Sequence, residues 1–208
     1  KELTNKFSKI YNNEMLSLNV GPPDIQPKAT DHIDDMILMI EKLIKNDCAY
    51  VMNNHVMFKV ESYKHYGKLS RRTLQEQLEG SRIEIADFKQ NARDFILWKP
   101  SKDEQPGWNS PWGRGRPGWH IECSTMSKKC LDIPFDIHCG GVDLTFPHHE
   151  NEIAQSCSAF KPNSEPENFS KYWFHNGFVT LNGEKMSKSL GNIQLVNDLL
   201  KKYNGETI

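Results

Sequence analysis

Strand-like and helical patterns alternate along the last third of the chain, and this alternation limits the folds open to it. Residues 135–138 predict a strand that runs into Gly140-Gly141, and residues 148–160 predict a helix. Residues 172–180 predict a second strand, and residues 194–203 predict an amphipathic helix. Such an order is typical of parallel strands joined by helices. We therefore predict an α/β fold and, in this region, the second half of a parallel sheet.

The first part of the chain predicts two helices and a short strand. Residues 2–16 and 29–48 are the predicted helices, and a proline-rich stretch separates them. The second helix has apolar residues at helical spacing, acids in its first turn and Thr30 as a candidate cap. A strand is predicted at 56–60. Residues 98–119 then combine prolines and glycines with four tryptophans, which indicates an ordered loop returning from a small inserted lobe.

Composition excludes several classes of protein. Apolar residues make up 37% and charged residues 25% of the chain, as expected for a soluble globular protein. No run approaches the roughly 18 apolar residues of a membrane helix, and residues 1–13 do not resemble a signal peptide. The five cysteines suggest reduced thiols or metal ligands rather than a disulfide framework. A net charge of -1 excludes a globally basic nucleic-acid binder, so any RNA contact must be local.

Three residues have the chemistry of zinc ligands. Cys123 precedes His148 by 25 residues, and Glu152 follows His148 at a helical spacing of four. Thiolate, imidazole and carboxylate groups all bind zinc. From these residues alone, a core cysteine and a surface His/Glu pair remain an alternative. A zinc-protease helix is excluded, because Ile153 stands where the second histidine of that motif would be.

Two further segments suit phosphate and ribose binding. Lys185 and Lys188 lie among small hydroxyl residues in the run Glu184–Asn192, a composition that fits a loop closing on polyphosphate. Gly141 permits a tight turn after a strand, and Asp143 could bind a ribose hydroxyl. A solvated loop and an ordinary turn are the alternatives that these residues leave open.

Together these motifs resemble the cysteinyl-tRNA synthetases of the class I aminoacyl-tRNA synthetases, in order and in spacing. The matching strings are GRPGWHIECS at 115–124, FDIHCGGVDL at 135–144, FPHHENEIAQS at 146–156 and KMSKSLGN at 185–192. The resemblance covers nearly the whole chain. It implies the latter part of a Rossmann-like catalytic domain with an inserted connective lobe. Residues 1–47 would be a helical part of that domain, 48–114 the insertion, and 115–208 the second half of the domain.

The resemblance also implies roles for individual residues. Cys123, His148 and Glu152 would bind Zn²⁺ together with a second cysteine, and Trp119 would lie beside the bound amino acid. Lys185 and Lys188 would act in catalysis. The residues implied in ATP binding are Gly141, Asp143, His175, Val179 and Lys188.

Two departures from the family pattern indicate an interior fragment of a longer enzyme. The HIGH motif of the family does not occur in the sequence. None of the remaining cysteines (Cys48, Cys130, Cys139 and Cys157) falls at the position of the second zinc cysteine. Cys139 replaces an expected glycine, and we do not assign it as a ligand.

The implied reaction is the activation of L-cysteine with ATP, accompanied by Mg²⁺, followed by transfer to the 3′ end of tRNA(Cys). Zinc would provide selectivity, because a thiophilic ion distinguishes a thiol from a hydroxyl better than an apolar pocket does. We expect a monomeric, cytoplasmic cysteine–tRNA ligase with no membrane association. The alternatives are a cysteine ligase of the mycothiol pathway, which would not depend on tRNA, and a non-catalytic zinc-binding module derived from a synthetase.

Overall fold

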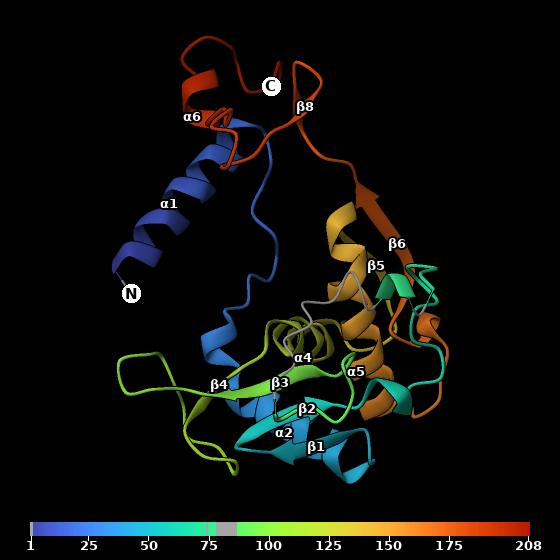
Figure 1. Ribbon diagram of the computed structural model, residues 1–208. Helices are drawn as coiled ribbons and strands as arrows, with labels where there is room; N and C mark the ends of the chain where they lie inside the picture. Colours follow the sequence, from blue (N-terminus) through green and yellow to red (C-terminus); the bar gives the residue numbers. More distant parts are fainter. Residues whose placement is uncertain (1, 74, 78–86) are drawn as a thin grey trace. The chain divides into compact units, whose positions relative to one another are not determined.

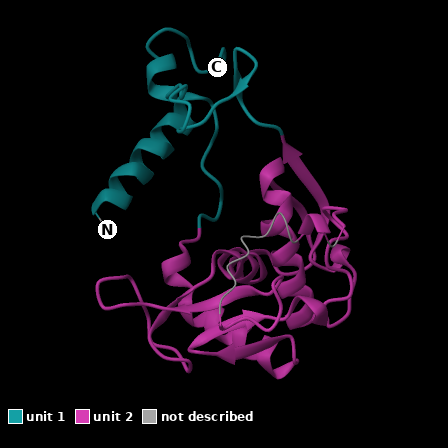
Figure 2. Ribbon diagram, viewed as in Figure 1, with its two compact units in different colours: residues 1–26, 177–208 teal, residues 27–176 magenta. Residues whose placement is uncertain are grey.

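The computed structural model describes residues 2–73, 75–77 and 87–208. The chain forms two compact units, which Figure 2 shows in different colours. The smaller unit contains residues 1–26 and 177–208, and the larger contains residues 27–176.

The smaller unit contains helix α1 (Glu2–Ser17), strands β7 (Thr180–Leu181) and β8 (Glu184–Lys185), and helix α6 (Val196–Leu199). Strands β7 and β8 form a tight antiparallel hairpin. Its two turn residues, Asn182 and Gly183, have φ angles of 53° and 84°, as two-residue hairpins require. The α1 helix confirms the prediction for residues 2–16. The predicted helix at 194–203 is wrong beyond one turn, because its apolar face buries no residue that could stabilise a longer helix.

The larger unit begins with helix α2 (Ile33–Lys45) and a four-stranded antiparallel sheet. Its strands are β1 (Ala49–Met52), β2 (His55–Phe58), β3 (Phe95–Pro100) and β4 (Gly115–Pro117), in that spatial order. The predicted strand at 56–60 corresponds to β2. Thr30 does not cap α2, since residues 29–31 form a separate 3₁₀ turn and His32 is the N-cap. The ring of His32 contacts Asp35 at 3.0 Å instead, within the first turn of the helix.

The second part of this unit has the predicted α/β alternation. Helix α4 (Trp119–Leu131), strand β5 (Phe135–Gly141), helix α5 (Glu150–Phe160) and strand β6 (Ser170–Asn176) follow one another along the chain (Figure 1). Strands β5 and β6 pair in parallel from Phe135↔Ser170 to Gly141↔Asn176. A parallel pair requires a crossover connection, and α5 lies within it. The α/β prediction is confirmed, whereas Val179 lies beyond the strand predicted to contain it.

Helices α2, α4 and α5 pack against one another in the larger unit. Met36, Ile40 and Leu43 of α2 are fully buried, as are Trp98 of β3 and Ile153 of α5. Short helical turns connect the main elements at Val60–Ser62, Val142–Leu144, Thr145–His149 and Pro166–Asn168. Among the described residues, no helix has the length and apolar content needed to cross a membrane. The predicted insertion at 48–114 stays a prediction.

Candidate metal and nucleotide sites

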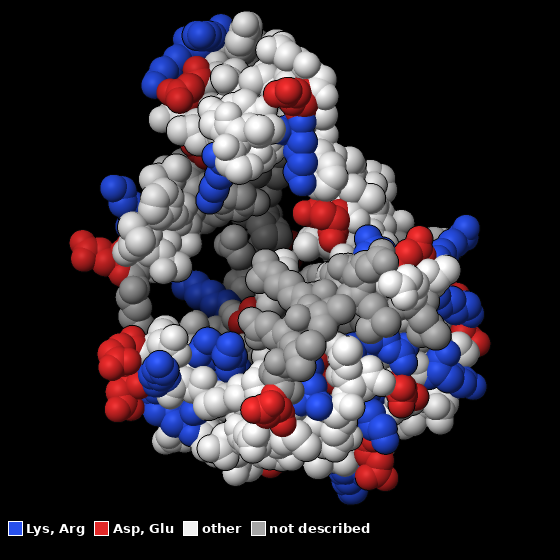
Figure 3. All heavy atoms as spheres, in the orientation of Figure 1, with Lys and Arg blue, Asp and Glu red and all other residues white. Residues whose placement is uncertain are grey.

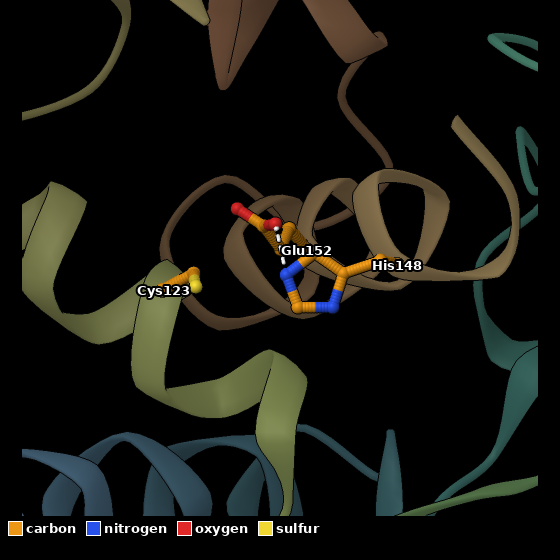
Figure 4. Close-up of side chains that lie close together, drawn as sticks. All are labelled: Cys123, His148 and Glu152. Carbon is orange, nitrogen blue, oxygen red and sulfur yellow. Dashed lines mark ion pairs between the residues drawn. The ribbon is translucent and has the colours of Figure 1, made fainter. Parts of the chain in front are cut away.

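The three predicted zinc ligands lie together in the larger unit. Cys123 belongs to α4, Glu152 belongs to α5, and His148 precedes α5 in the turn Thr145–His149 (Figure 4). Their candidate ligand atoms all lie within 4.8 Å of one another. His148 Nε2 is 3.0 Å from Glu152 Oε1. The spacing of four between His148 and Glu152 therefore does put both side chains on one face, as predicted.

A buried polar contact between α4 and α5 sets the position of Cys123. Ser124, the next residue along α4, donates a hydrogen bond to Gln155 Oε1 at 2.7 Å and contacts the backbone oxygen of Glu152 at 3.3 Å. Ser124 and Gln155 are both fully buried. Because buried polar groups have few alternative partners, this contact fixes the register of the two helices. The sulfur of Cys123 is thereby held beside Glu152.

Glu152 supplies negative charge in the interior. Its side chain is 1% exposed, and Oε2 lies 3.2 Å from His138 Nε2. Both carboxylate oxygens are buried, and each has lone pairs left for a further partner. Burial alone would raise the pKa of this carboxyl, but His138 and His148 outweigh burial and lower the pKa to about 2. Glu152 is therefore ionised at neutral pH, as a candidate metal ligand must be.

The Cys123 thiol is protonated in the absence of a metal ion. Burial is the main reason that its pKa rises to about 12, and the charges of Glu152 and Glu122 add to the effect. Binding of a metal ion must release this proton. Donors on a tetrahedral zinc lie roughly 3.5 Å apart, so the observed grouping needs only small side-chain movements. The sulfur, nitrogen and oxygen donors thus fit zinc, with coordination positions left open.

Histidines that sequence reasoning did not single out surround this site. His120 Nδ1 lies 2.6 Å from His148 Nδ1, and burial, aided by His148, lowers the pKa of His120 to about 3. His138 and His149 form a second possible donor set, which shares Glu152 with the first. His120 lies one helical turn before Cys123 on α4, so helical spacing could have identified it as a neighbour of the candidate zinc cysteine. Cys139 is exposed and belongs to neither donor set.

Trp119, predicted to lie beside bound cysteine, stands at the start of α4 next to the donor set. Its ring centroid is 4.1 Å from that of His148. The side chain is 60% exposed, so much of the indole remains free to contact another molecule. Its role with an amino-acid substrate stays a prediction.

The predicted ATP-binding residues of the larger unit gather where β5 and β6 end. Gly140 pairs with His175 in the parallel register, and Gly141 immediately precedes the turn that carries the exposed Asp143. His175 Nε2 lies 2.8 Å from His149 Nδ1. A Cβ atom at Gly140 would lie only 2.7 Å from the His149 ring, so glycine is required there. The carboxyl ends of parallel strands are where α/β proteins bind nucleotides.

The lysine loop lies in the smaller unit. Asn192 orders it, because its Oδ1 accepts the backbone N–H of Ser187 at 2.8 Å and its Nδ2 donates to the oxygen of Lys185 at 3.2 Å. The Lys185 ammonium is 3.5 Å from the centroid of the Phe178 ring. Lys188 is exposed and forms no ion pair in the described part of the chain. The predicted ATP-binding roles of Val179 and Lys188 stay predictions.

A Glu150→Gln substitution tests how strongly buried hydrogen bonds of α5, the helix that carries Glu152, stabilise the fold. Glu150 is fully buried, and its two oxygens accept the backbone N–H groups of Gly67 at 2.8 Å and Ser70 at 2.9 Å. Glutamine removes the charge and one acceptor, so we expect the free energy of unfolding to fall by about 1–3 kcal/mol. Urea unfolding of the metal-free protein measures this. The control Glu165→Gln weakens contacts of a half-exposed carboxylate with Lys68 and His65 and should change little. Equal losses in both variants would contradict the prediction.

Comparison with known proteins assigns a class that agrees with this fold. The family described as tRNA synthetases class I (C) catalytic domain matches residues 1–208, and the chain belongs to this family. A cysteine–tRNA ligase of Maricaulis maris is 53% identical over 208 residues, covering 100% of this chain and 44% of the relative. One from Saccharophagus degradans is 55% identical over 206 residues, with 99% and 44% covered. The chain thus spans less than half the length of these relatives.

A solved structure supports the fold independently. The putative arginyl-tRNA synthetase of Campylobacter jejuni superposes with a TM-score of 0.52 at 13% sequence identity. The match covers 97% of this chain and 35% of that one. At this identity the likeness concerns the fold, which is that of an aminoacyl-tRNA synthetase.

Proposed function

We propose that the chain forms part of the catalytic core of an enzyme that activates L-cysteine with ATP and transfers it to tRNA(Cys). The observation that carries the proposal is the donor set of Cys123, His148 and Glu152 in a chain of this family. The relatives named cysteine–tRNA ligase, at 53–55% identity, support the same substrate.

In the first step, a carboxylate oxygen of cysteine attacks the α-phosphorus of ATP. The bond from that phosphorus to the bridging oxygen breaks, and pyrophosphate leaves with the bonding electrons. No side-chain nucleophile takes part, so the protein contributes by positioning and by stabilising charge. Lys185 and Lys188 neutralise charge on the departing phosphates, where Mg²⁺ also accompanies the nucleotide. Gly141, Asp143, His175 and Val179 hold the adenosine.

Selectivity for cysteine rests on the donor set. Cys123, His148 and Glu152 would hold Zn²⁺, and a bound zinc ion supplies a thiophilic Lewis acid that favours a thiolate over a hydroxyl. His138 and His148 keep Glu152 ionised for this purpose. Trp119 covers the substrate on one side and excludes water. A pocket without such a ligand would discriminate poorly between side chains that differ by one atom.

In the second step, a ribose hydroxyl oxygen of the terminal adenosine of tRNA attacks the carbonyl carbon of the adenylate. The bond between that carbon and the phosphate oxygen breaks, AMP leaves, and the hydroxyl proton passes to the phosphate or to water.

All three zinc donors come from one chain, which suits a monomer. The five cysteines are free, which suits the reducing cytoplasm.

ATP–pyrophosphate exchange by the full-length gene product tests this function. We expect exchange to depend on cysteine, with serine giving no signal above background. Charging of tRNA(Cys) then identifies the acceptor. A folded, zinc-loaded protein that shows no exchange with cysteine would refute the proposal.

A further inference from the structure

An aromatic ring, and not an acid, holds the side chain of Lys185 in the smaller unit. The Lys185 ammonium lies 3.5 Å from the centroid of the Phe178 ring, well within the roughly 6 Å over which cation–π attraction acts. Within the ranges that the structure describes, Lys185 takes part in no ion pair. Both residues belong to the segment 177–208 of that unit, so the contact is a property of the hairpin region alone.

The pairing of β7 with β8 brings the two side chains together. Thr180 lies opposite Lys185 in the hairpin. The Met186 N–H donates to the Val179 oxygen at 2.9 Å, which extends the pairing toward Phe178. Side chains two residues apart on a strand share a face, so Phe178 is the diagonal neighbour of Lys185, a spacing at which rings and long side chains reach each other. The contact therefore follows from the register of the hairpin.

Several surface lysines pair with acids instead. Lys201 of the same unit lies 2.7 Å from Asp198, and acids and bases are interspersed over the face that Figure 3 shows. A carboxylate partner cancels much of the charge of a lysine, and a phosphate must displace it in order to bind. A ring attracts the ammonium through its quadrupole but carries no net charge. Phe178 thus holds Lys185 while leaving its positive charge available to an anionic ligand.

The backbone of Lys185 is fixed as well. Asn192 Nδ2 donates to the Lys185 oxygen at 3.2 Å, so this lysine is held at its backbone and at its ammonium. Lys188 differs, because it is exposed and has neither an ion pair nor a cation–π contact among the described residues. Ordering a long side chain costs conformational entropy, and a side chain that is already ordered does not lose that entropy again when it meets its ligand.

We propose that Phe178 is a positioning residue for cysteine activation: its ring holds the Lys185 ammonium, charged and ordered, ready to neutralise the departing phosphates. The inference rests on the proposed function, which gives Lys185 that role. Phe178 acts through the lysine and not by contact with the substrate. Its contribution is the ordering of one charge before the reaction begins, which is how electrostatic preorganisation lowers a barrier.

The test compares three substitutions in the full-length protein. Phe178→Leu keeps apolar bulk but removes the ring, and kcat for cysteine-dependent pyrophosphate exchange should fall about two- to fivefold, the factor expected for an exposed cation–π contact. Phe178→Trp keeps an aromatic face and should exchange at the parental rate or faster. Phe7→Leu on α1 is the matched control, because Phe7 is also exposed in the smaller unit and forms no cation–π contact in the described part of the chain. Zinc content and KM for cysteine should stay unchanged in all three.

A double-mutant cycle then shows whether Phe178 acts through Lys185. Lys185→Met keeps an unbranched apolar stem without the charge, and adding Phe178→Leu to it should lower kcat no further. A loss of the same size that persists in the Lys185→Met background would refute the inference, because the ring would then act on something else. Parental exchange in Phe178→Leu, or an equal loss in Phe178→Trp, would also refute it. Parental exchange in Lys185→Met would remove this lysine from the reaction and the inference with it.

These outcomes are distinct from failure of the proposed function. Absence of cysteine-dependent exchange in the parent protein would refute that function, whatever the Phe178 variants do. Normal exchange in the parent, together with any of the contrary results above, would refute the positioning role alone.

Discussion

A Cys123→Ser variant is expected to lose most of its zinc and to bind cysteine at least about 100-fold more weakly, while its affinity for ATP stays the same. Serine is a poor zinc ligand at neutral pH, because its hydroxyl keeps its proton. Mutation of residues that only hydrogen-bond to metal ligands already costs about 10–100-fold in metal affinity, so loss of a ligand should cost at least as much. The substitution is nearly isosteric, so the α4–α5 contact through Ser124 should survive. Elemental analysis and calorimetric titration with cysteine and with ATP measure these effects.

Cys130→Ser is the matched control for this variant. Cys130 lies on the same helix, is also partly buried, and belongs to neither donor set. Its substitution should leave zinc content and cysteine affinity unchanged. If Cys123→Ser also retained full zinc and cysteine binding, Cys123 would not be a ligand and the selectivity argument would be wrong.

A Lys188→Ala variant should lower kcat for pyrophosphate exchange by about 10²–10³-fold without changing zinc content or cysteine affinity. The magnitude follows from removing one group that stabilises charge developing in the transition state. Lys188 is exposed on a loop that Asn192 holds through two hydrogen bonds, so truncation of its side chain should not disturb the loop backbone. Steady-state exchange at saturating ATP and cysteine measures the effect.

Lys201→Ala serves as the control, because Lys201 is exposed in the same unit and, among the residues that the structure describes, pairs only with Asp198. It should exchange at the parental rate. A rate for Lys188→Ala within threefold of the parent would show that this lysine does not stabilise the leaving pyrophosphate.

The sequence predicted the α/β fold and the proximity of His148 and Glu152 because both depend on local spacing, whereas Cys123 was grouped with them through the resemblance to the family. His148 and Glu152 are four residues apart, and the alternation of strands and helices after residue 119 defines the parallel pair. The histidine network could not be predicted in this way. His138 reaches Glu152 only because β5 lies beside α5, a long-range arrangement that no local pattern encodes.

The predictions that failed depended on local sequence patterns alone. The apolar pattern of 194–203 gives only the single turn of α6, and the predicted strand at 172–180 stops at Asn176. In both places the element ends where buried partners are lacking among the described residues. The capping role of Thr30 was wrong because a separate 3₁₀ turn precedes α2, which local composition does not reveal.

X-ray absorption at the zinc edge of the purified full-length protein tests the central claim most directly, namely that Cys123, His148 and Glu152 hold a zinc ion that binds the substrate thiol. Before substrate is added, the spectrum should contain sulfur together with nitrogen or oxygen ligands at about 2.0–2.3 Å. Addition of cysteine should increase the sulfur shell by one scatterer, and addition of serine should leave it unchanged. A sulfur shell that does not respond to cysteine would contradict the account.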